Sequence, residues 1–278
     1  MRMETRAVPD LSAYFARLGI APPRKADVAA LRAIARAHPN AIAFENLDSL
    51  MGRRVPIGLA AIENKLLHRG RGGYCFEHNT LLAHVLTALG FRVTRLAARV
   101  EMGGMPATGR RTHMVLKVET EEGPFIADAG FGGRTLTAPL RLEDDGAQAT
   151  PLGEFRLQRE GGGILEQTRI GGEWRTLYRF SLEEFLHGDF EVLNWFVSTH
   201  PDSPFVSRLL AARTLDDRWY GLMNDQFSVH YADGREERRQ MKNAGEIAGV
   251  LENELGIKLP EPRADLNAAL QKLSSASR

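Results

Sequence analysis

The sequence is poor in cysteine, in net charge and in long apolar runs. Its 278 residues contain one cysteine, Cys75, which cannot form an internal disulfide and excludes metal sites built from several cysteines. The 36 basic and 35 acidic residues nearly cancel, so net charge gives no support for a polyanionic partner such as nucleic acid. No window approaches the roughly 20 apolar residues that a helix needs to cross a bilayer.

The remaining composition is that of an ordinary globular protein. Hydrophobic residues make up 43% and charged residues 26% of the chain, and the length allows one large domain or two to three small ones. Residues 1–6 are charged and lack the apolar run of a secretory signal peptide. Together with the single unpaired thiol, these features predict a cytoplasmic protein in a reducing compartment.

The first ninety residues predict helices. Asp10 precedes an apolar helical pattern that ends at Gly19, and Asp27 precedes a second pattern that ends before Pro39. Aspartate is a favoured N-terminal cap, whereas glycine and proline are typical of the residues that follow a helix. A third helix is expected over residues 59–68.

A fourth helix is expected to begin at Cys75, shortly after a pair of glycines. The apolar residues behind the cysteine share one face of a 3.6-residue period, and Gly90 follows at the position of a C-terminal cap. These residues are Leu81, Leu82, Val85, Leu86 and Leu89. The free N–H groups and the positive dipole end of a helix N-terminus stabilise an anion, so they favour a reactive Cys75 thiolate. The alternative is a buried structural cysteine, because free cysteines are among the most buried residues.

From Phe91 onward the pattern changes to the alternation typical of β-strands. Residues 112–118 and 125–128 predict the two arms of a hairpin that turns at residues 121–123. Further short strands are expected near residues 155–157, 163–167 and 174–180. A run of short antiparallel strands favours a small barrel or sandwich.

The next segment predicts a helix followed by a loop. Residues 181–184 have the form of a capping box, which predicts a helix from there to Thr199 with a break near Gly188. The two prolines within residues 200–205 predict a turn or loop, because proline is not tolerated in a helix interior.

The C-terminal segment predicts a second hairpin and two helices. The hairpin arms are residues 226–231 and 236–240, and the turn is expected at residues 233–234. The helices are expected over residues 243–256 and from residue 266 onward.

A nucleophilic cysteine needs a base within hydrogen-bond reach, and the base needs a group that orients it. Four of the eight histidines flank breaks or helix ends, where an exposed histidine is usual. They are His38, His68, His187 and His200. His78 and His84 share the helix of Cys75, and His78 points along the helix axis more easily than onto the sulfur. His230, in the second hairpin, lacks a carboxylate in an obvious supporting position.

His113 and Asp128 differ from the other candidates because the first predicted hairpin brings them to the same end of a sheet. His113 begins one arm and Asp128 ends the other. An aspartate at the end of an otherwise apolar strand is costly unless a partner such as a histidine N–H binds it. The alternative is a surface hairpin with unremarkable polar residues. With the cysteine at a helix start, the pair predicts a Cys75–His113–Asp128 triad.

Taken in order, several segments resemble the arylamine N-acetyltransferases. Three of them surround the predicted triad, namely residues 71–77, 112–114 and 128–132. Two further segments agree, at residues 44–47 and 194–205. The resemblance spans roughly residues 10–205, and nothing specific matches beyond about Gly221.

The resemblance implies an α+β fold with a thiol-protease-like Cys-His-Asp core. It implies an N-terminal helical bundle over residues 1–91, which carries the nucleophile. A central antiparallel β-barrel over residues 92–200 would carry the histidine and the aspartate, and an α/β lid would follow over residues 201–278.

The resemblance also implies acetyl-CoA as donor, no metal, and a small-molecule arylamine, hydrazine or N-hydroxyarylamine as acceptor. It implies ping-pong transfer through an acetyl-cysteine, with no nucleic-acid or membrane partner. Phe44, Phe131 and Phe205 match positions that line the acceptor pocket, although ordinary core packing is the alternative for Phe44 and Phe205. Thr112 and Gly132 would lie near the cofactor, where Gly132 and its glycine neighbours let backbone approach it closely.

The resemblance further implies that Glu45 and Arg71 form a buried structural ion pair. Three competing functions remain open at this point. A thiol hydrolase or transglutaminase-like enzyme uses the same triad, and so does an amide synthase that closes a macrocycle. The third alternative is a non-catalytic binding module, and the intact triad argues against it.

Overall fold

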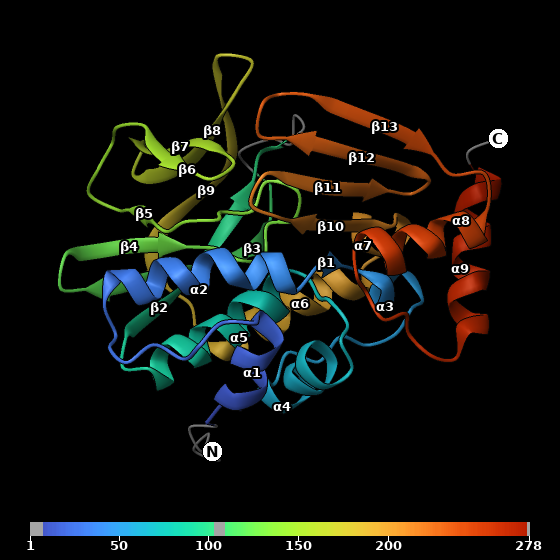
Figure 1. Cartoon of the computed structure of the whole chain (residues 1–278), viewed down its shortest axis with the longest axis horizontal. Coiled ribbons are helices and arrows are strands. Elements are labelled where there is room, and N and C mark those ends of the chain that lie inside the picture. Colours follow the sequence, from blue (N-terminus) through green and yellow to red (C-terminus); the bar gives the residue numbers. More distant parts are fainter. Residues whose placement is uncertain (1–7, 103–108, 277–278) are drawn as a thin grey trace.

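The structure is a computed structural model that describes residues 8–102 and 109–276, with side chains to residue 273. Figure 1 shows helices α1, α2, α4 and α5 in the lower half of the molecule, an eight-stranded sheet at the upper left and a five-stranded sheet at the upper right. Helices α8 and α9 lie at the right in Figure 1, next to the ends of the strands of the five-stranded sheet. Within the described residues, no helix is both long and apolar enough to span a membrane.

The N-terminal helices begin where the sequence predicts them, except for the short helix α3, which was not predicted. They are α1 (Leu11–Leu18), α2 (Val28–Ala41), α3 (Leu47–Leu50), α4 (Leu59–Glu63) with the π-helical segment η1 (Asn64–His68), and α5 (Cys75–Ala88). The Asp10 carboxylate accepts the Ala13 N–H at 2.9 Å, and the Asp27 carboxylate accepts the Ala30 N–H at 2.9 Å. Both predicted N-terminal caps are therefore confirmed.

Helix α2 does not stop before Pro39, so this predicted helix end is wrong. The proline lies in the last turn, where its missing N–H removes one hydrogen bond, but the Ile42 N–H still bonds to the His38 carbonyl at 2.9 Å. His38 and Pro39 are both buried. Their burial stabilises a helical turn that local propensity disfavours.

The central strands form the nearly closed antiparallel barrel that the sequence predicts. They are β2 (Arg92–Val100), β3 (Arg111–Thr120), β4 (Gly123–Ala127), β5 (Leu140–Arg141), β6 (Gln148–Thr150), β7 (Gly153–Glu160), β8 (Gly163–Ile170) and β9 (Glu173–Glu184). Their spatial order is β5-β4-β3-β2-β9-β8-β7-β6. The Gln148 side chain joins the two ends of this sheet, because it accepts the Arg141 N–H at 2.7 Å and donates to the Arg141 carbonyl at 3.0 Å.

The capping box predicted at residues 181–184 is wrong, because these residues complete β9. Glu184 pairs with Leu96 of β2, so strand pairing outweighs the local helix signal. Helix α6 (His187–Thr199) begins later. The Asp189 carboxylate caps this start, because it accepts the N–H of Leu186, the residue before the helix, at 2.8 Å.

The loop predicted at residues 200–205 is correct only in its first half. Helix α7 (Pro204–Ser207) is a single turn that starts at Pro204, where proline is tolerated because its missing N–H would lack a partner anyway. The Ser203 hydroxyl accepts the Phe205 N–H at 3.3 Å and caps this turn. Phe205 therefore projects from a helical turn and not from an irregular loop.

The second sheet joins distant parts of the chain. Its strands are β1 (Phe44–Glu45), β10 (Leu210–Thr214), β11 (Arg218–Met223), β12 (Gln226–Tyr231) and β13 (Glu236–Gln240), in that spatial order. The predicted β12–β13 hairpin is confirmed, whereas β1, β10 and β11 were not predicted. The sheet is followed by α8 (Ala244–Gly249), the π-helical segment η3 (Val250–Glu254) and α9 (Arg263–Ala276). The division of the chain at residues 91 and 200 stays a prediction.

Three helices meet through a buried chain of polar side chains. The Tyr14 hydroxyl of α1 lies 2.9 Å from His38 Nδ1 of α2, and His38 Nε2 lies 2.9 Å from His78 Nδ1 of α5. His78 Nε2 lies 3.2 Å from the Ala43 carbonyl and 3.1 Å from the Gly73 carbonyl. A carbonyl oxygen can only accept, so His78 Nε2 carries a hydrogen and His78 Nδ1 accepts from His38 Nε2. His38 Nδ1 then accepts from the Tyr14 hydroxyl, and both rings are neutral.

The expectation of an exposed His38 is therefore wrong, since both histidines are fully buried. Burial lowers the pKa of His38 well below its ordinary value, and the neighbouring His78 lowers it further. Burial likewise lowers the pKa of His78 to about 4, although its two carbonyl partners oppose the shift. The orientation of His78 away from Cys75 agrees with the sequence prediction.

We expect acid to weaken the fold through this histidine pair. Below the unfolded-state pKa of 6.5, the unfolded chain takes up protons that the folded rings refuse. Each ring therefore reduces the free energy of unfolding by about 1.4 kcal/mol per pH unit below that value. Urea unfolding between pH 7.5 and 5.5 measures this slope. His38→Gln should make it shallower than in wild type, whereas the partly exposed His187→Gln should not; equal slopes in all three proteins would contradict the assignment.

Candidate active site

Cys75, His113 and Asp128 lie together although they come from three elements. Cys75 is the first residue of α5, His113 belongs to β3, and Asp128 follows β4. His113 Nε2 donates to Asp128 Oδ2 at 2.7 Å, and the interaction with Cys75 helps to raise the pKa of the same ring. The three residues are only 3%, 2% and 2% exposed. The structure thus brings the predicted residues into one chain that is shielded from bulk water.

The β3–β4 hairpin sets the histidine and the aspartate side by side. Leu116 pairs with Ala127 across the two strands, so Asp128 lies just beyond the last paired residue and near the start of β3. The Thr112 carbonyl, next to His113, lies 3.6 Å from Cys75 Sγ. The hairpin predicted from the sequence therefore brings the His113 ring close to both the sulfur and the carboxylate.

Asn79 ties the cysteine helix to both other elements, and sequence reasoning missed it. Its amide nitrogen donates to the Met114 carbonyl at 2.7 Å and to Asp128 Oδ1 at 2.8 Å. Its amide oxygen accepts the Ala129 N–H at 3.0 Å. Residues four apart share a helix face, so the spacing from Cys75 to Asn79 was a signal that could have identified it.

Asp128 is a buried carboxylate with every acceptor position in use. Oδ1 accepts from Asn79 and from the Gly130 N–H at 2.8 Å, and Oδ2 accepts from His113 and lies 3.2 Å from the Tyr178 hydroxyl. Burial raises the pKa of Asp128, but the His113 charge and these hydrogen bonds outweigh it and the net shift is downward. The carboxylate therefore stays ionised inside the protein.

The same pairing keeps His113 protonated. Burial lowers the pKa of His113, but the charge and hydrogen bond of Asp128, with a smaller contribution from Cys75, raise it to about 10. The ring also packs against Phe131 at a centroid distance of 5.2 Å and against Tyr178 at 4.8 Å. These contacts fix the plane of the imidazole between the sulfur and the carboxylate.

The backbone before Cys75 is held by close contacts that require glycine. The Glu45 N–H donates to the Gly73 carbonyl at 2.7 Å. A Cβ on Gly72 would lie 2.1 Å from the Ala43 carbonyl oxygen, and one on Gly73 would lie 2.7 Å from the Glu77 carboxylate. The two glycines therefore allow β1 and Glu77 to lie directly against the chain that leads into α5.

The predicted Glu45–Arg71 ion pair is present and belongs to a larger buried network. Arg71 Nη2 lies 2.7 Å from Glu45 Oε1, and Arg71 also binds Asp48 at 3.0 Å. Lys65 Nζ lies 2.9 Å from Asp48 and 2.8 Å from Glu77. Glu77 in turn accepts the Tyr74 N–H at 3.1 Å. The network thus anchors the residue that precedes Cys75.

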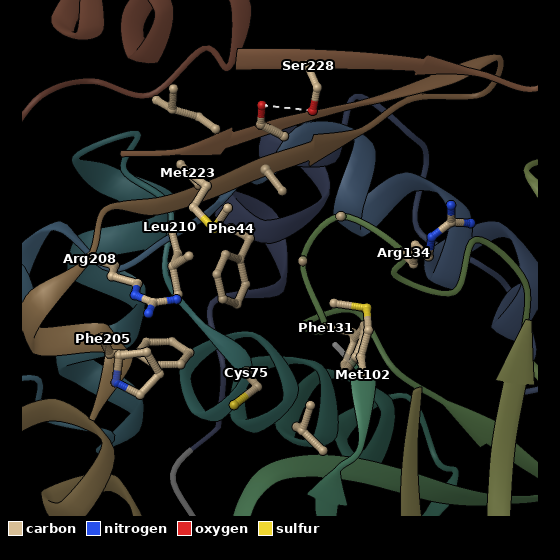
Figure 2. A pocket seen from close by; sticks show the side chains of 18 of the residues that line it. Phe44, Cys75, Met102, Phe131, Arg134, Phe205, Arg208, Leu210, Met223 and Ser228 are labelled. Carbon is tan, nitrogen blue, oxygen red and sulfur yellow. Dashed lines mark hydrogen bonds between the residues drawn. The ribbon is translucent and has the colours of Figure 1, made fainter. Parts of the chain in front are cut away.

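A cavity of about 1100 Å³ opens directly above Cys75. All five residues predicted to bind substrate or cofactor line it, namely Phe44, Phe131, Phe205, Thr112 and Gly132. Figure 2 shows Phe44 and Phe205 on one side of the cysteine and Phe131 with Met102 on the other. The cavity therefore reaches the sulfur between aromatic walls.

Phe44 and Phe205 serve both the pocket and the core. Their ring centroids lie 6.1 Å apart in an edge-to-face arrangement, and Phe205 meets Tyr74 in the same way at 5.4 Å. Both phenylalanines are partly buried and pack against the core formed by the helices and the barrel. The two residues therefore line the cavity and pack in the core at once.

The glycines after Asp128 have local structural roles. A Cβ on Gly130 would lie 2.7 Å from the Cys75 Cα, and one on Gly133 would lie 2.6 Å from the Trp219 ring. At both positions a close contact with another part of the protein requires glycine, so no bound cofactor is needed to explain why these residues are glycines. Gly132 has φ +101°, which favours glycine, and it faces the pocket beside Phe44.

The far wall of the pocket carries residues that sequence reasoning missed. The rings of Trp219 and His230 stack at a centroid distance of 3.7 Å, and Arg134 lies over the indole at 5.5 Å. His230 also lies 3.7 Å from Glu236, so the expectation that it lacks a nearby carboxylate is wrong. Trp219, His230 and Glu236 belong to strands β11–β13, which match no motif near the triad, whereas Arg134 lies between β4 and β5. Within residues 8–102 and 109–276, no cluster of three or more His, Cys, Asp or Glu side chains could hold a metal ion.

Comparison with known sequences places the chain among acetyltransferases. A family model described as N-acetyltransferase matches residues 27–264. The arylamine N-acetyltransferase of Mycolicibacterium smegmatis is 40% identical over 90% of this chain and 92% of that protein. The arylamine N-acetyltransferase / N-hydroxyarylamine O-acetyltransferase of Salmonella typhimurium is 39% identical over 89% of this chain and 88% of its own length.

Comparison with solved structures agrees. The structure of Mycobacterium marinum arylamine N-acetyltransferase in complex with CoA superposes with a TM-score of 0.91 at 40% identity. The match covers 95% of this chain and 99% of that one. The α+β fold of a helical bundle, a barrel and a second sheet is therefore shared over nearly the whole length.

We expect the ionic network below Cys75 to be a major source of stability. Arg71→Met leaves Glu45 buried without its closest cation, which should reduce the free energy of unfolding by about 3–5 kcal/mol. Arg36→Met is the matched control, because Arg36 pairs with Asp216 where both side chains are about half exposed, and it should cost less than about 1 kcal/mol. Urea unfolding measures both values. An Arg71→Met protein as stable as wild type would show that the network is not structural.

Proposed function

Because the chain belongs to the arylamine N-acetyltransferase family, we propose that Cys75, His113 and Asp128 are its catalytic triad. The enzyme transfers an acetyl group from acetyl-CoA to an arylamine, and we extend the acceptors to hydrazines and N-hydroxyarylamines. The observation that supports the triad is the buried His113–Asp128 hydrogen bond, with Cys75 and His113 lining the same large pocket.

In the first half-reaction, Cys75 is the nucleophile. Its proton resides on His113, and the imidazolium that results is held by Asp128. The thiolate attacks the acetyl carbon of the thioester, and the carbon–sulfur bond to coenzyme A breaks. The departing CoA thiolate takes the proton from His113, which leaves an acetyl-cysteine and a neutral ring.

In the second half-reaction, His113 acts as the base. The amine nitrogen attacks the acetyl carbon of acetyl-Cys75 while the ring accepts the amine proton. The carbon–sulfur bond breaks, the acetylated amine leaves, and the thiolate–imidazolium pair forms again. Donor and acceptor react in turn at one sulfur, so the kinetics are ping-pong.

The negative charge on the acetyl oxygen needs a hydrogen-bond donor in both halves. The Cys75 backbone N–H is the natural candidate, because the first N–H groups of a helix have no partner within the helix. Cys75 is the first residue of α5, so its N–H and the positive dipole end of the helix lie next to the carbon under attack.

The pocket fits both substrates. Phe44, Phe131 and Phe205 offer ring faces and edges to a flat aromatic amine. We propose that Thr112 and Gly132 lie against the pantetheine arm or the phosphates of acetyl-CoA. The pocket is also lined by arginines whose positive charge suits those phosphates. They are Arg110, Arg134, Arg208, Arg238 and Arg239.

The other functions are not favoured by the comparisons, because the relatives are named as acetyltransferases and not as amide synthases or thiol hydrolases. The acceptor is a small molecule, and the nearly balanced charge of the chain gives nucleic acid no electrostatic attraction. We also propose a cytoplasmic location, supported by a single thiol that works only in its reduced form.

We expect wild-type protein incubated with acetyl-CoA to gain one acetyl group on Cys75, and an arylamine to remove it. Intact-mass analysis measures both steps. Cys75→Ala should gain nothing, and His113→Ala should be acetylated at least about a thousandfold more slowly because it lacks the base. His187→Ala is the matched control, since His187 lies at the start of α6 outside the pocket. Acetyl transfer without an acetyl-enzyme, or an acetyl group on Cys75→Ala, would contradict the proposed triad.

We expect Asn46 to control acceptor binding from behind the pocket wall. Its buried amide donates to the carbonyls of Phe205 and Arg208, both at 2.7 Å, and accepts the Leu210 N–H at 2.8 Å. Asn46→Ala frees all three residues, so kcat/KM for an arylamine should fall on the order of tenfold, although acetyl-Cys75 still forms. The exposed Asn253→Ala is the control. Unchanged kcat/KM in a folded Asn46→Ala protein would refute this role.

A further inference from the structure

A buried carboxyl group, that of Glu166, is linked to Asp128 of the triad through the Tyr178 hydroxyl. Glu166 is in β8 with only 1% of its surface exposed. Among the described residues, its carboxyl has one hydrogen-bond partner, the hydroxyl of Tyr178. A buried carboxylate with a single donor is poorly compensated, so Glu166 needs an explanation that the reaction steps above do not supply.

The Tyr178 hydroxyl lies between two acids. It is hydrogen-bonded to Glu166 and lies 3.2 Å from Asp128 Oδ2. A hydroxyl has one proton to donate, so it cannot donate to two carboxylates at once. If both acids were ionised, one of the two contacts would join oxygens with no hydrogen between them. One of the acids must therefore carry a proton for both contacts to be hydrogen bonds.

The surroundings decide which acid is protonated. Asp128 accepts three N–H donors, from His113, Asn79 and Gly130, at 2.7–2.8 Å, whereas Glu166 has none. Burial and the charge of Asp128 raise the pKa of Glu166 to about 8, although the Tyr178 hydrogen bond and the His113 charge lower it. Asp128 therefore keeps the charge and Glu166 keeps the proton.

We propose that Glu166 is a positioning residue of the triad, which donates its proton to Tyr178 so that Tyr178 donates to Asp128. This inference rests on the proposed role of the triad. The chain then runs from Cys75 through His113, Asp128 and Tyr178 to Glu166, with one negative charge on the two acids. The Tyr178 ring packs against the rings of His113 and Phe131 and is held in place. Its O–H bond can still rotate, so the acceptor of the hydroxyl proton can change.

Ionisation of Glu166 should slow the reaction. The titratable groups that act on it are Asp128, Tyr178 and His113. Once Glu166 loses its proton, the Tyr178 hydroxyl turns toward the new carboxylate and Asp128 loses a donor. Two negative charges then hold the His113 imidazolium, and the ring gives its proton to the departing CoA thiolate less readily. The rate of acetyl-enzyme formation should therefore fall as pH rises through about 8.

The test compares wild type, Glu166→Gln and Glu166→Leu by single-turnover release of CoA between pH 6 and 10. Glutamine keeps a donor for Tyr178 and cannot ionise, so it should retain more activity than leucine at pH 7 and should lack the fall near pH 8. Leucine removes the donor that orients the Tyr178 hydroxyl and cannot ionise, so its rate at pH 7 should be on the order of tenfold below wild type and should also lack the fall near pH 8. Glu154→Gln on the outer face of β7, where Glu154 pairs with Arg169, should keep the wild-type profile.

A second readout does not depend on activity. The unfolded chain loses the Glu166 proton above about 4.5, while the folded protein keeps it until about 8, so this group reduces stability as pH rises between those values. The melting temperature of Glu166→Gln relative to wild type should therefore rise steadily from pH 5 to pH 8. This comparison still decides the matter if Glu166→Leu does not fold.

The inference would be overturned if the rate of CoA release fell in the same way above pH 8 in wild type and in Glu166→Gln, and if their difference in melting temperature did not change with pH. Equal activity of the glutamine and leucine variants at pH 7 would also overturn it. The proposed triad fails differently, because wild-type protein would then release no CoA at any pH and form no acetyl-enzyme.

Discussion

The site depends on one buried charge, the carboxylate of Asp128. Taking a carboxylate out of water is expensive unless hydrogen bonds and an opposite charge replace its hydration. Donors come from several parts of the fold: the His113 ring from β3, the Asn79 amide from α5, and the Gly130 N–H from the chain just beyond. Tyr178 of β9 completes the set. The helical layer and the barrel must therefore meet at this position, and the ring held between them can keep a proton beside Cys75.

Much of this site could be predicted because its signals are local. A lone cysteine at a helix start, and a histidine and an aspartate on the arms of one hairpin, can be recognised within a few residues each. The argument that selected Asp128, an acid at the end of an apolar strand, applies less clearly to Glu166, which follows Leu165 but precedes the polar Gln167. Sequence reasoning did not use it there, because Tyr178 is the partner that gives Glu166 its role and no local pattern identifies that tyrosine.

The rest could not be predicted, because it arises from contacts between distant segments. Strand β1 is two residues long and exists because β10 pairs with it, from Phe44 to Ala212. Asn46 shapes the pocket through bonds to residues about 160 positions away. The capping-box signal at residues 181–184 is overridden by pairing of β9 with β2. In each case tertiary contacts outweigh local propensity, which is a weak prior on its own.

The central claim is that Asp128 keeps the His113 ring charged beside the cysteine. Nitrogen NMR of protein with labelled histidine tests it most directly, since the two ring nitrogens report whether both carry a proton. The account predicts that His113 stays doubly protonated until the pH approaches about 10 in the wild-type enzyme. In Asp128→Asn it should lose the second proton at a much lower pH. A wild-type His113 that titrates near the ordinary value of 6.5, or one that Asp128→Asn leaves unchanged, would contradict the account.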